Sequence, residues 1–100
     1  MTRVEPFDAL GNPTRRAILR QLRSGAMTVE ELTRCFTVSR PAVSRHLATL
    51  AKAGLVDVRE AGASNLYSVR VEGFESVRHF LDEFWDDALD RLQALAREKR

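Results

Sequence analysis

Cysteine, long apolar runs and secretion signals are scarce or missing in this sequence of 100 residues. Cys35 is the only cysteine, so no disulfide can form within the chain, which fits a reducing compartment. No apolar run approaches the roughly 18 residues that a membrane helix needs. The opening segment, MTRVEPFDAL, has no apolar signal-peptide core. We therefore expect a cytoplasmic protein that has no membrane partner.

Catalytic patterns are missing as well. The sequence has no Gly-rich phosphate loop, no spacing typical of a nucleophile and its base, and no pair of carboxylates among apolar residues. A chain of this length is expected to form a single small domain, residues 1–100, with little room for a deep pocket. We therefore expect no enzyme activity and no cofactor.

Positive charge is unevenly distributed along the chain. Residues 1–71 contain eleven Lys and Arg against six Asp and Glu, whereas residues 72–100 contain five against eight. The first part is therefore a cationic body and the tail is acidic. A cationic body suits a polyanionic partner such as nucleic acid, although the same charges can also be ordinary solvated surface.

Helix signals fill the first half of the sequence. VEPFDAL predicts a short helix with Pro6 in its first turn. Asn12 can cap a second helix, in which Pro13 takes the first position. Both signals are local, so they predict where helices begin before anything is known of their packing.

Two further helices follow in close succession. Thr28 with Glu31 three residues later is a capping box for a third helix. The turn TVS then leads to Ser39, which can cap a fourth helix that closes at Gly54. Residues 28–53 thus have the helix-turn-helix layout.

Beyond Gly54 the apolar period changes from 3.6 to 2. In LVDVRE, Val56 and Val58 share one face, and in NLYSVRV, Tyr67, Val69 and Val71 share one face. The small-residue turn AGAS separates the runs, so residues 55–71 predict a β-hairpin. The expected fold is mainly α with a small β-hairpin (α+β), a winged helix-turn-helix in the order α-α-α-α-β-β-α.

The last segment, residues 74–98, predicts one long helix with a continuous apolar stripe. At 1.5 Å per residue it exceeds about 30 Å, more than the rest of the domain can cover. A second copy of the chain is the simplest cover, and a helix folded back on its own domain is the alternative. Together with residues 1–10, the expected homodimer interface comprises Val4, Phe7, Leu10, Phe74, Val77, Leu81, Phe84, Trp85, Ala88 and Leu92.

The fourth helix has an outward face suited to DNA. With Val43, Leu47 and Leu50 buried, the outward residues are small, hydroxylic or cationic, and Thr37 to Ala53 contains no carboxylate. Arg45 can donate two parallel hydrogen bonds to guanine. We expect this helix to read the major groove of double-stranded DNA, although a solvated helix surface is the simpler alternative.

The expected DNA contacts differ in role. Arg45 and Ser44 would read bases, while residues at helix starts and on the hairpin would contact phosphates. His46 either packs and bonds a neighbouring backbone or reaches the DNA backbone. Of Arg15 and Arg16, one is expected at phosphate or at the partner subunit and the other in a surface ion pair. The full set is Arg16, Thr28, Ser39, Arg40, Pro41, Ser44, Arg45, His46, Thr49, Arg59 and Ser64.

Three collinear stretches within residues 7–69 resemble the ArsR/SmtB family of winged-helix transcriptional repressors: FDALGNPTRRAILRQL, MTVEELTRCFTVSRPAVSRHLATLAKAGLV and LYSV. The tail FLDEFWDDALDRLQAL also resembles a metal-independent branch of that family. The resemblance implies a homodimer held by its first and last helices. It also implies a recognition helix at residues 39–53 and repression by occupying an operator.

The sequence departs from the family at its metal sites. Thr33 stands where a metal-binding cysteine is common, Cys35 alone remains, and His79 is the only histidine of the last helix. One thiol and no paired histidines cannot build a four-ligand site, so no metal cofactor is expected. We expect Cys35 to be a partly buried packing residue, although an exposed thiol could be oxidised.

The hairpin departs from the family too. Ala63 stands beside the turn glycine where the family often has arginine, so the wing, with Arg59 and Ser64, should contact DNA weakly. Two alternatives to a simple repressor stay open. One is a protein-interaction module, which the polar outward face of the fourth helix disfavours. The other is a repressor induced by an unidentified small-molecule effector or by thiol oxidation.

Overall fold

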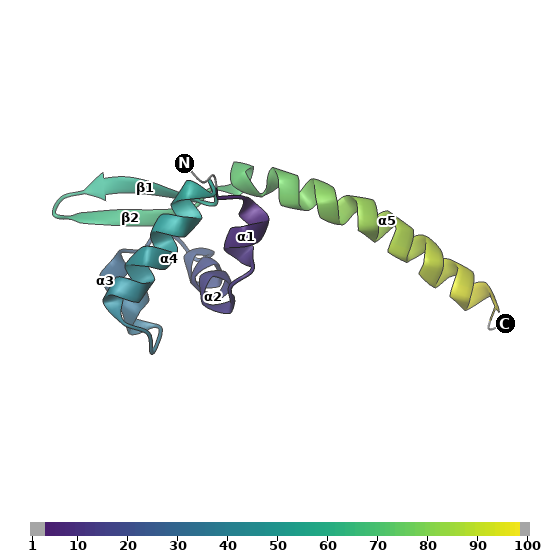
Figure 1. The fold of residues 1–100 in the computed structure, drawn as a ribbon, viewed down its shortest axis with the longest axis horizontal. Coiled ribbons are helices and arrows are strands. Elements are labelled where there is room, and N and C mark those ends of the chain that lie inside the picture. Colours follow the sequence, from purple (N-terminus) through teal and green to yellow (C-terminus); the bar gives the residue numbers. More distant parts are fainter. Residues whose placement is uncertain (1–3, 99–100) are drawn as a thin grey trace.

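A computed structural model describes residues 4–98 of the chain, and Figure 1 shows their arrangement. Residues 1–3 of the expected segment 1–10 lie outside this range. The described elements, in chain order, are α1 (Pro6–Leu10), α2 (Pro13–Leu22), α3 (Val29–Arg34), α4 (Arg40–Lys52), β1 (Val56–Ala61), β2 (Ser64–Val69), a 3-10 helix (Val71–Phe74) and α5 (Glu75–Glu98). This order confirms the predicted mainly α fold with a small β-hairpin.

Side-chain caps begin three of the helices where the sequence predicts them. Asn12 accepts hydrogen bonds from two backbone N–H groups in the first turn of α2. Thr28 and Glu31 form the capping box of α3. The Ser39 hydroxyl accepts a hydrogen bond of 3.3 Å from a backbone N–H in the first turn of α4. Each cap of this kind contributes about 1 kcal/mol and fixes the residue at which its helix begins.

The core lies where α2, α3 and α4 pack against the base of the hairpin. Val43, Leu47 and Leu50 of α4 are fully buried, as predicted. The other members of this cluster are Ala9, Ile18, Leu19, Leu22, Leu32, Ala53, Leu55 and Val56. Burying one leucine or valine side chain contributes about 1.5–3 kcal/mol. The buried stripe therefore determines which face of α4 stays outside.

The hairpin is antiparallel, with Val56 opposite Val69 and the register continuing to a turn of two residues, Gly62 and Ala63. Gly62 has a φ of 65°, which glycine adopts without strain. Met27 and Tyr67 exchange two backbone hydrogen bonds of 3.0 and 2.9 Å. These bonds hold β2 beside the segment that leads into α3, so the wing is fixed relative to the helix-turn-helix.

The wing ends earlier than its alternating pattern predicts. Val71, expected on the apolar face of the second strand, lies in the 3-10 helix and is 73% exposed. β1 begins opposite Val69, so no strand residue is left to pair with Val71. The last helix accordingly starts at Glu75, one residue later than predicted. A Cβ at Gly73 would overlap the carbonyl oxygen of Gly54, so this crossing into α5 requires a glycine.

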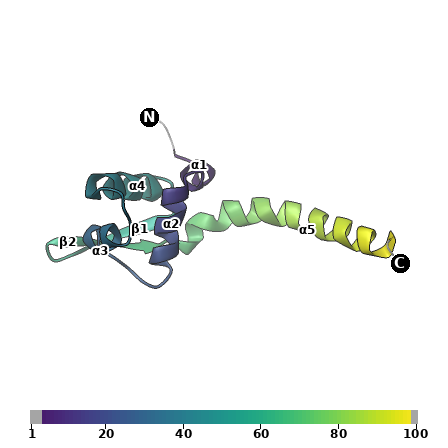
Figure 2. The same cartoon turned by 90° about the horizontal axis from the view of Figure 1, so that it is seen from below.

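α5 projects away from the rest of the molecule, on the side opposite the hairpin (Figures 1 and 2). Its 24 residues span about 36 Å at 1.5 Å per residue, and the chain as a whole measures 62 × 31 × 21 Å. The predicted apolar stripe is therefore left largely uncovered by the chain itself. Among residues 4–98, no helix combines the length and the apolar character that crossing a membrane requires.

Candidate nucleic-acid interface

The outward face of α4 is exposed along its whole length, and α4 lies at one edge of the body (Figure 2). Pro41, Ser44, Arg45 and Lys52 are exposed, and Thr49 is half-buried at the border of the face. No acidic residue lies in the first turn, so the positive end of the helix dipole is not offset within α4. The face can therefore approach a polyanion with backbone and side-chain donors together.

A groove joins three elements at the start of α4. It has a volume of about 230 Å³ and is lined by Thr28, Val29, Glu30, Arg40, Ala63, Ser64, Asn65 and Tyr67. Three of the expected DNA contacts thus converge from α3, α4 and the wing, namely Thr28, Arg40 and Ser64. Arg59, the other expected wing contact, is exposed on β1 but does not line this groove.

Two expected contacts already use part of their hydrogen-bonding capacity within the fold. The oxygens of Thr28 and Ser39 accept from backbone N–H groups, which leaves their hydroxyl protons available for a phosphate. Thr49 instead donates its hydroxyl proton to the carbonyl of Arg45 at 3.1 Å. Thr49 is therefore less suited to donate to DNA than the two capping residues.

Sequence reasoning missed a carboxylate at this surface. Glu30 of α3 forms an ion pair with Arg40, with 3.3 Å between Oε1 and Nη2, and both side chains are more than half exposed. The sequence between Thr37 and Ala53 has no carboxylate, but the turn brings Glu30 to the start of α4 from the preceding helix. The one local sequence signal for this position of Glu30 is the capping box of α3, because it fixes the residue at which that helix begins and therefore the direction in which Glu30 points.

Arg15 and Arg16 both bind the end of α1. Arg15 Nε donates to the carbonyl oxygen of Ala9 at 2.7 Å, and its Nη2 donates to that of Asp8 at 3.2 Å. Arg16 Nη1 donates to the carbonyl oxygen of Leu10 at 2.8 Å, with the side chain still exposed. The expected surface ion pair for one of these arginines is wrong, since both satisfy carbonyls that α1 leaves open.

His46 packs against Arg15 rather than bonding a backbone group. Its Nδ1 lies 3.4 Å from Arg15 Nη1, so the neutral ring can accept a hydrogen bond there. Partial burial, followed by the positive charges of Arg15 and Arg45, lowers the pKa of His46 below its ordinary value of 6.5. The contact links α4, through Arg15, to the end of α1.

This lowered pKa predicts a pH dependence of stability. The folded state disfavours protonated His46, so the free energy of unfolding should fall as the pH falls from about 6.5 through the lowered pKa. The measurement is chemical denaturation at a series of pH values between about 5 and 8. His46→Gln should flatten the fall in this window, whereas His79→Gln, the matched histidine control, should retain it. Identical profiles for wild type and His46→Gln would contradict the assignment.

Cys35 is exposed, contrary to the expectation of a partly buried packing residue. α3 ends at Arg34, and Cys35 is the residue that caps its C-terminal end. Its thiol lies 3.5 Å from the carbonyl oxygen of Glu31. Within residues 4–98, no three His, Cys, Asp or Glu side chains are grouped as metal ligands.

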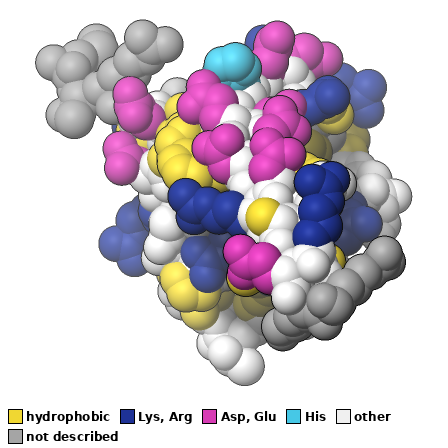
Figure 3. Space-filling model, turned by 90° about the vertical axis from the view of Figure 1, so that its right-hand side faces the viewer, with side chains coloured by type: hydrophobic (Ala, Val, Ile, Leu, Met, Phe, Trp, Pro, Cys, Tyr) yellow, Lys and Arg dark blue, Asp and Glu magenta, His cyan; other side chains and the backbone are white. Residues whose placement is uncertain are grey.

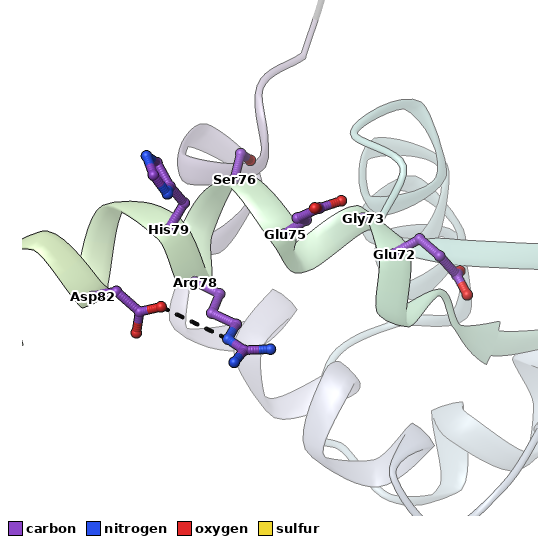
Figure 4. A pocket seen from close by; sticks show the side chains of 7 residues that line it. All are labelled: Glu72, Gly73, Glu75, Ser76, Arg78, His79 and Asp82. Atoms are coloured by element: carbon purple, nitrogen blue, oxygen red, sulfur yellow. Dashed lines mark ion pairs between the residues drawn. The ribbon is translucent and has the colours of Figure 1, made fainter.

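A hollow of about 630 Å³ lies at the start of α5 and does not resemble a site (Figure 4). Arg78 and Asp82 pair along the helix, with 3.8 Å between Nε and Oδ2. Ser76 and His79 extend to the other side of the helix, and Glu72 points away from both groups. The lining side chains do not converge on one point, so they offer no common ligand site.

α5 carries a second candidate surface along its apolar stripe. Phe7 of α1 packs edge-on against Phe80, with 5.1 Å between ring centroids, and Phe80 packs on Phe84 at 4.8 Å. Figure 3, which looks along α5 from its C-terminal end, shows hydrophobic side chains beside a band of acidic ones. The large apolar residues that are exposed on α5 are Phe80, Leu81, Phe84, Trp85, Leu89, Leu92 and Leu95.

Not every expected interface residue belongs to this uncovered surface. Val4, Leu10 and Phe74 pack in part against the chain's own core, and Val77 is half-buried. Phe7 is 42% exposed, and Ala88 is exposed on α5. The domain thus covers part of the expected dimer interface near the start of α5 and leaves exposed the part that lies further along α5.

Comparison with known proteins gives one consistent result. A helix-turn-helix domain family matches residues 10–59. The chain is 46% identical over 83 residues to the HTH-type transcriptional regulator Rv2034 of Mycobacterium tuberculosis, covering 83% of this chain and 78% of that protein. It is 36% identical over 63 residues to the transcriptional repressor SdpR of Bacillus subtilis, covering 63% and 70%. The crystal structure of an ArsR family transcriptional regulator is similar with a TM-score of 0.73, 32% identity, and coverage of 80% and 88%.

Proposed function

The chain belongs to the ArsR/SmtB family of winged helix-turn-helix transcriptional regulators, and on this premise we propose that it is a dimeric repressor that binds an inverted-repeat operator without a metal cofactor. Membership of the family makes it a DNA-binding regulator and not an enzyme. The proposal of a repressor that reads an operator rests on the exposed face of α4, where Ser44 and Arg45 have no carboxylate of their own helix beside them.

Each residue of the interface has a proposed role. Arg45 and Ser44 read base edges in the major groove, because they lie near the start of α4 on its outward face. Arg40 and Thr28 hold phosphates from the groove at the helix start. The remaining expected contacts, Arg16, Ser39, Pro41, His46, Thr49, Arg59 and Ser64, contribute backbone contacts or close approach.

Dimerisation would place two such helices on one duplex. The uncovered apolar face of α5, continued by Phe7 on α1, supports an interface with a second copy of the chain. In a two-fold dimer the α4 helices enter successive major grooves about 34 Å apart, so the operator is an inverted repeat. We propose that occupying that operator represses transcription, in line with the B. subtilis relative, which is a transcriptional repressor.

Selection of bound sequences from a random DNA pool at physiological salt tests this proposal. We expect enrichment of a palindrome whose half-site centres lie about 10 base pairs apart. Affinity should fall steeply with salt, because each phosphate contact releases counterions. Arg97→Gln, on the face of α5 opposite the apolar stripe, is the control and should select the same palindrome. No enrichment, or an affinity that does not change with salt, would refute the proposal.

A further inference from the structure

Glu30 is placed where a DNA-binding surface would be expected to exclude negative charge. Its carboxylate pairs with Arg40 at 3.3 Å, and the two side chains are 58% and 63% exposed. Both residues line two neighbouring hollows, one of about 230 Å³ shared with the wing and one of about 420 Å³ shared with Thr33 and Arg34. The pair therefore lies at the surface that faces DNA in the proposed complex.

The fold gives Glu30 no capping duty that would explain its position. Glu31 closes the capping box, accepting a hydrogen bond from the backbone N–H of Thr28 at 3.0 Å. Glu30 adds a favourable charge to the first turn of α3, but Glu31 already supplies one there. An exposed ion pair contributes little to stability, so stability alone is a weak reason for the Arg40 contact.

We propose that Glu30 is a specificity-determining residue, an internal counter-ion for Arg40 that lowers the affinity for random duplex more than the affinity for the operator. The inference rests on the proposed function, because it assumes an operator. Non-specific binding comes from neutralising phosphates and releasing their counterions. A guanidinium that a carboxylate already neutralises contributes little to that release, so Glu30 weakens the non-specific complex.

The operator complex loses less from the same pairing. Base contacts by Ser44 and Arg45 do not involve Glu30, and they carry a share of the affinity that random DNA cannot provide. The pair also engages only one N–H group that the structure records, and a guanidinium has five. Arg40 can thus donate to a correctly placed phosphate without leaving Glu30.

The test compares wild type with Glu30→Gln, which removes the charge and keeps the shape. Fluorescence anisotropy gives the affinity for the selected operator and for a random duplex of equal length over a range of salt concentrations. We expect the random duplex to bind roughly fivefold more tightly to the variant, an effect in the range of one exposed ion pair. The slope of log K against log salt should steepen by about 0.9, the value for one added phosphate contact. The operator affinity should change less than about twofold.

Two controls separate the action through Arg40 from a general change of charge. Asp86→Asn removes one negative charge on the far face of α5 and should leave slope and specificity unchanged. The double variant with Glu30→Gln and Arg40→Gln should gain no more affinity for the random duplex than this control does. An unchanged slope in Glu30→Gln, or a full gain without Arg40, would overturn the inference alone. Wild-type protein that does not prefer the operator would overturn the proposed function and this inference with it.

Discussion

Replacing Arg45 with alanine is expected to weaken operator binding by about 1–3 kcal/mol, a loss of roughly fivefold to 150-fold, and to relax base preference at one position of each half-site. Arg45 is exposed on the outward face of α4, while the buried stripe behind it holds that helix in place. Truncation therefore removes a guanidinium fork without disturbing the core. Anisotropy titrations with operators mutated one base pair at a time would measure both effects.

Two further variants separate the loss of the guanidinium fork of Arg45 from the loss of its positive charge. Arg45→Lys keeps the charge but loses the planar fork, so it should retain affinity for random DNA and lose base preference. Arg97→Ala removes the same charge from the far end of α5 and should have little effect on the operator. An equal loss on random and operator DNA in Arg45→Ala would show that the side chain contacts only phosphate.

Leu81→Glu is expected to convert the protein into a monomer and to weaken operator binding strongly. Leu81 is 56% exposed in the middle of the apolar face of α5. In a two-fold interface the substitution occurs twice, and each copy loses about 1.5–3 kcal/mol of apolar burial and gains a carboxylate without a partner. A monomer reads one half-site, so its affinity should fall by about 100-fold or more.

Sedimentation equilibrium and the same DNA titrations would measure this effect together. Asp86→Ala, on the opposite face of α5, is the matched control and should stay dimeric with normal operator affinity. Far-ultraviolet circular dichroism should show that Leu81→Glu keeps its helices. A dimeric Leu81→Glu variant, or a wild-type chain that is monomeric in dilute solution, would refute the proposed interface.

The helix starts and the core were predictable because their signals are local. The caps at Asn12, Thr28 and Ser39 act within one turn, and helical spacing alone buries Val43 and Leu47. The same helical spacing predicts the apolar stripe of α5, which the rest of the chain leaves largely exposed. These features follow from residues a few positions apart, so the sequence displays them directly.

The contacts that sequence reasoning missed join residues from different elements. Glu30 reaches Arg40 only because the turn after α3 brings two helix starts together. Arg15 contacts α1 and His46 because α1 folds back over the start of α2, which no spacing reveals. Cys35, expected to be partly buried, is exposed where α3 meets the turn that follows it. Each case depends on the angle at which two segments meet, which their separate patterns do not contain.

In the proposed dimer, the uncovered face of α5 would tie gene control to the concentration of the protein. If two chains must dimerise before either binds an operator, then operator binding depends on the concentration of the dimer. While most of the protein is monomeric, the dimer concentration rises with the square of the total protein concentration. Halving the total protein concentration therefore leaves about a quarter of the dimer. A cell could then release its target genes sharply by dilution during growth, with no chemical signal at all.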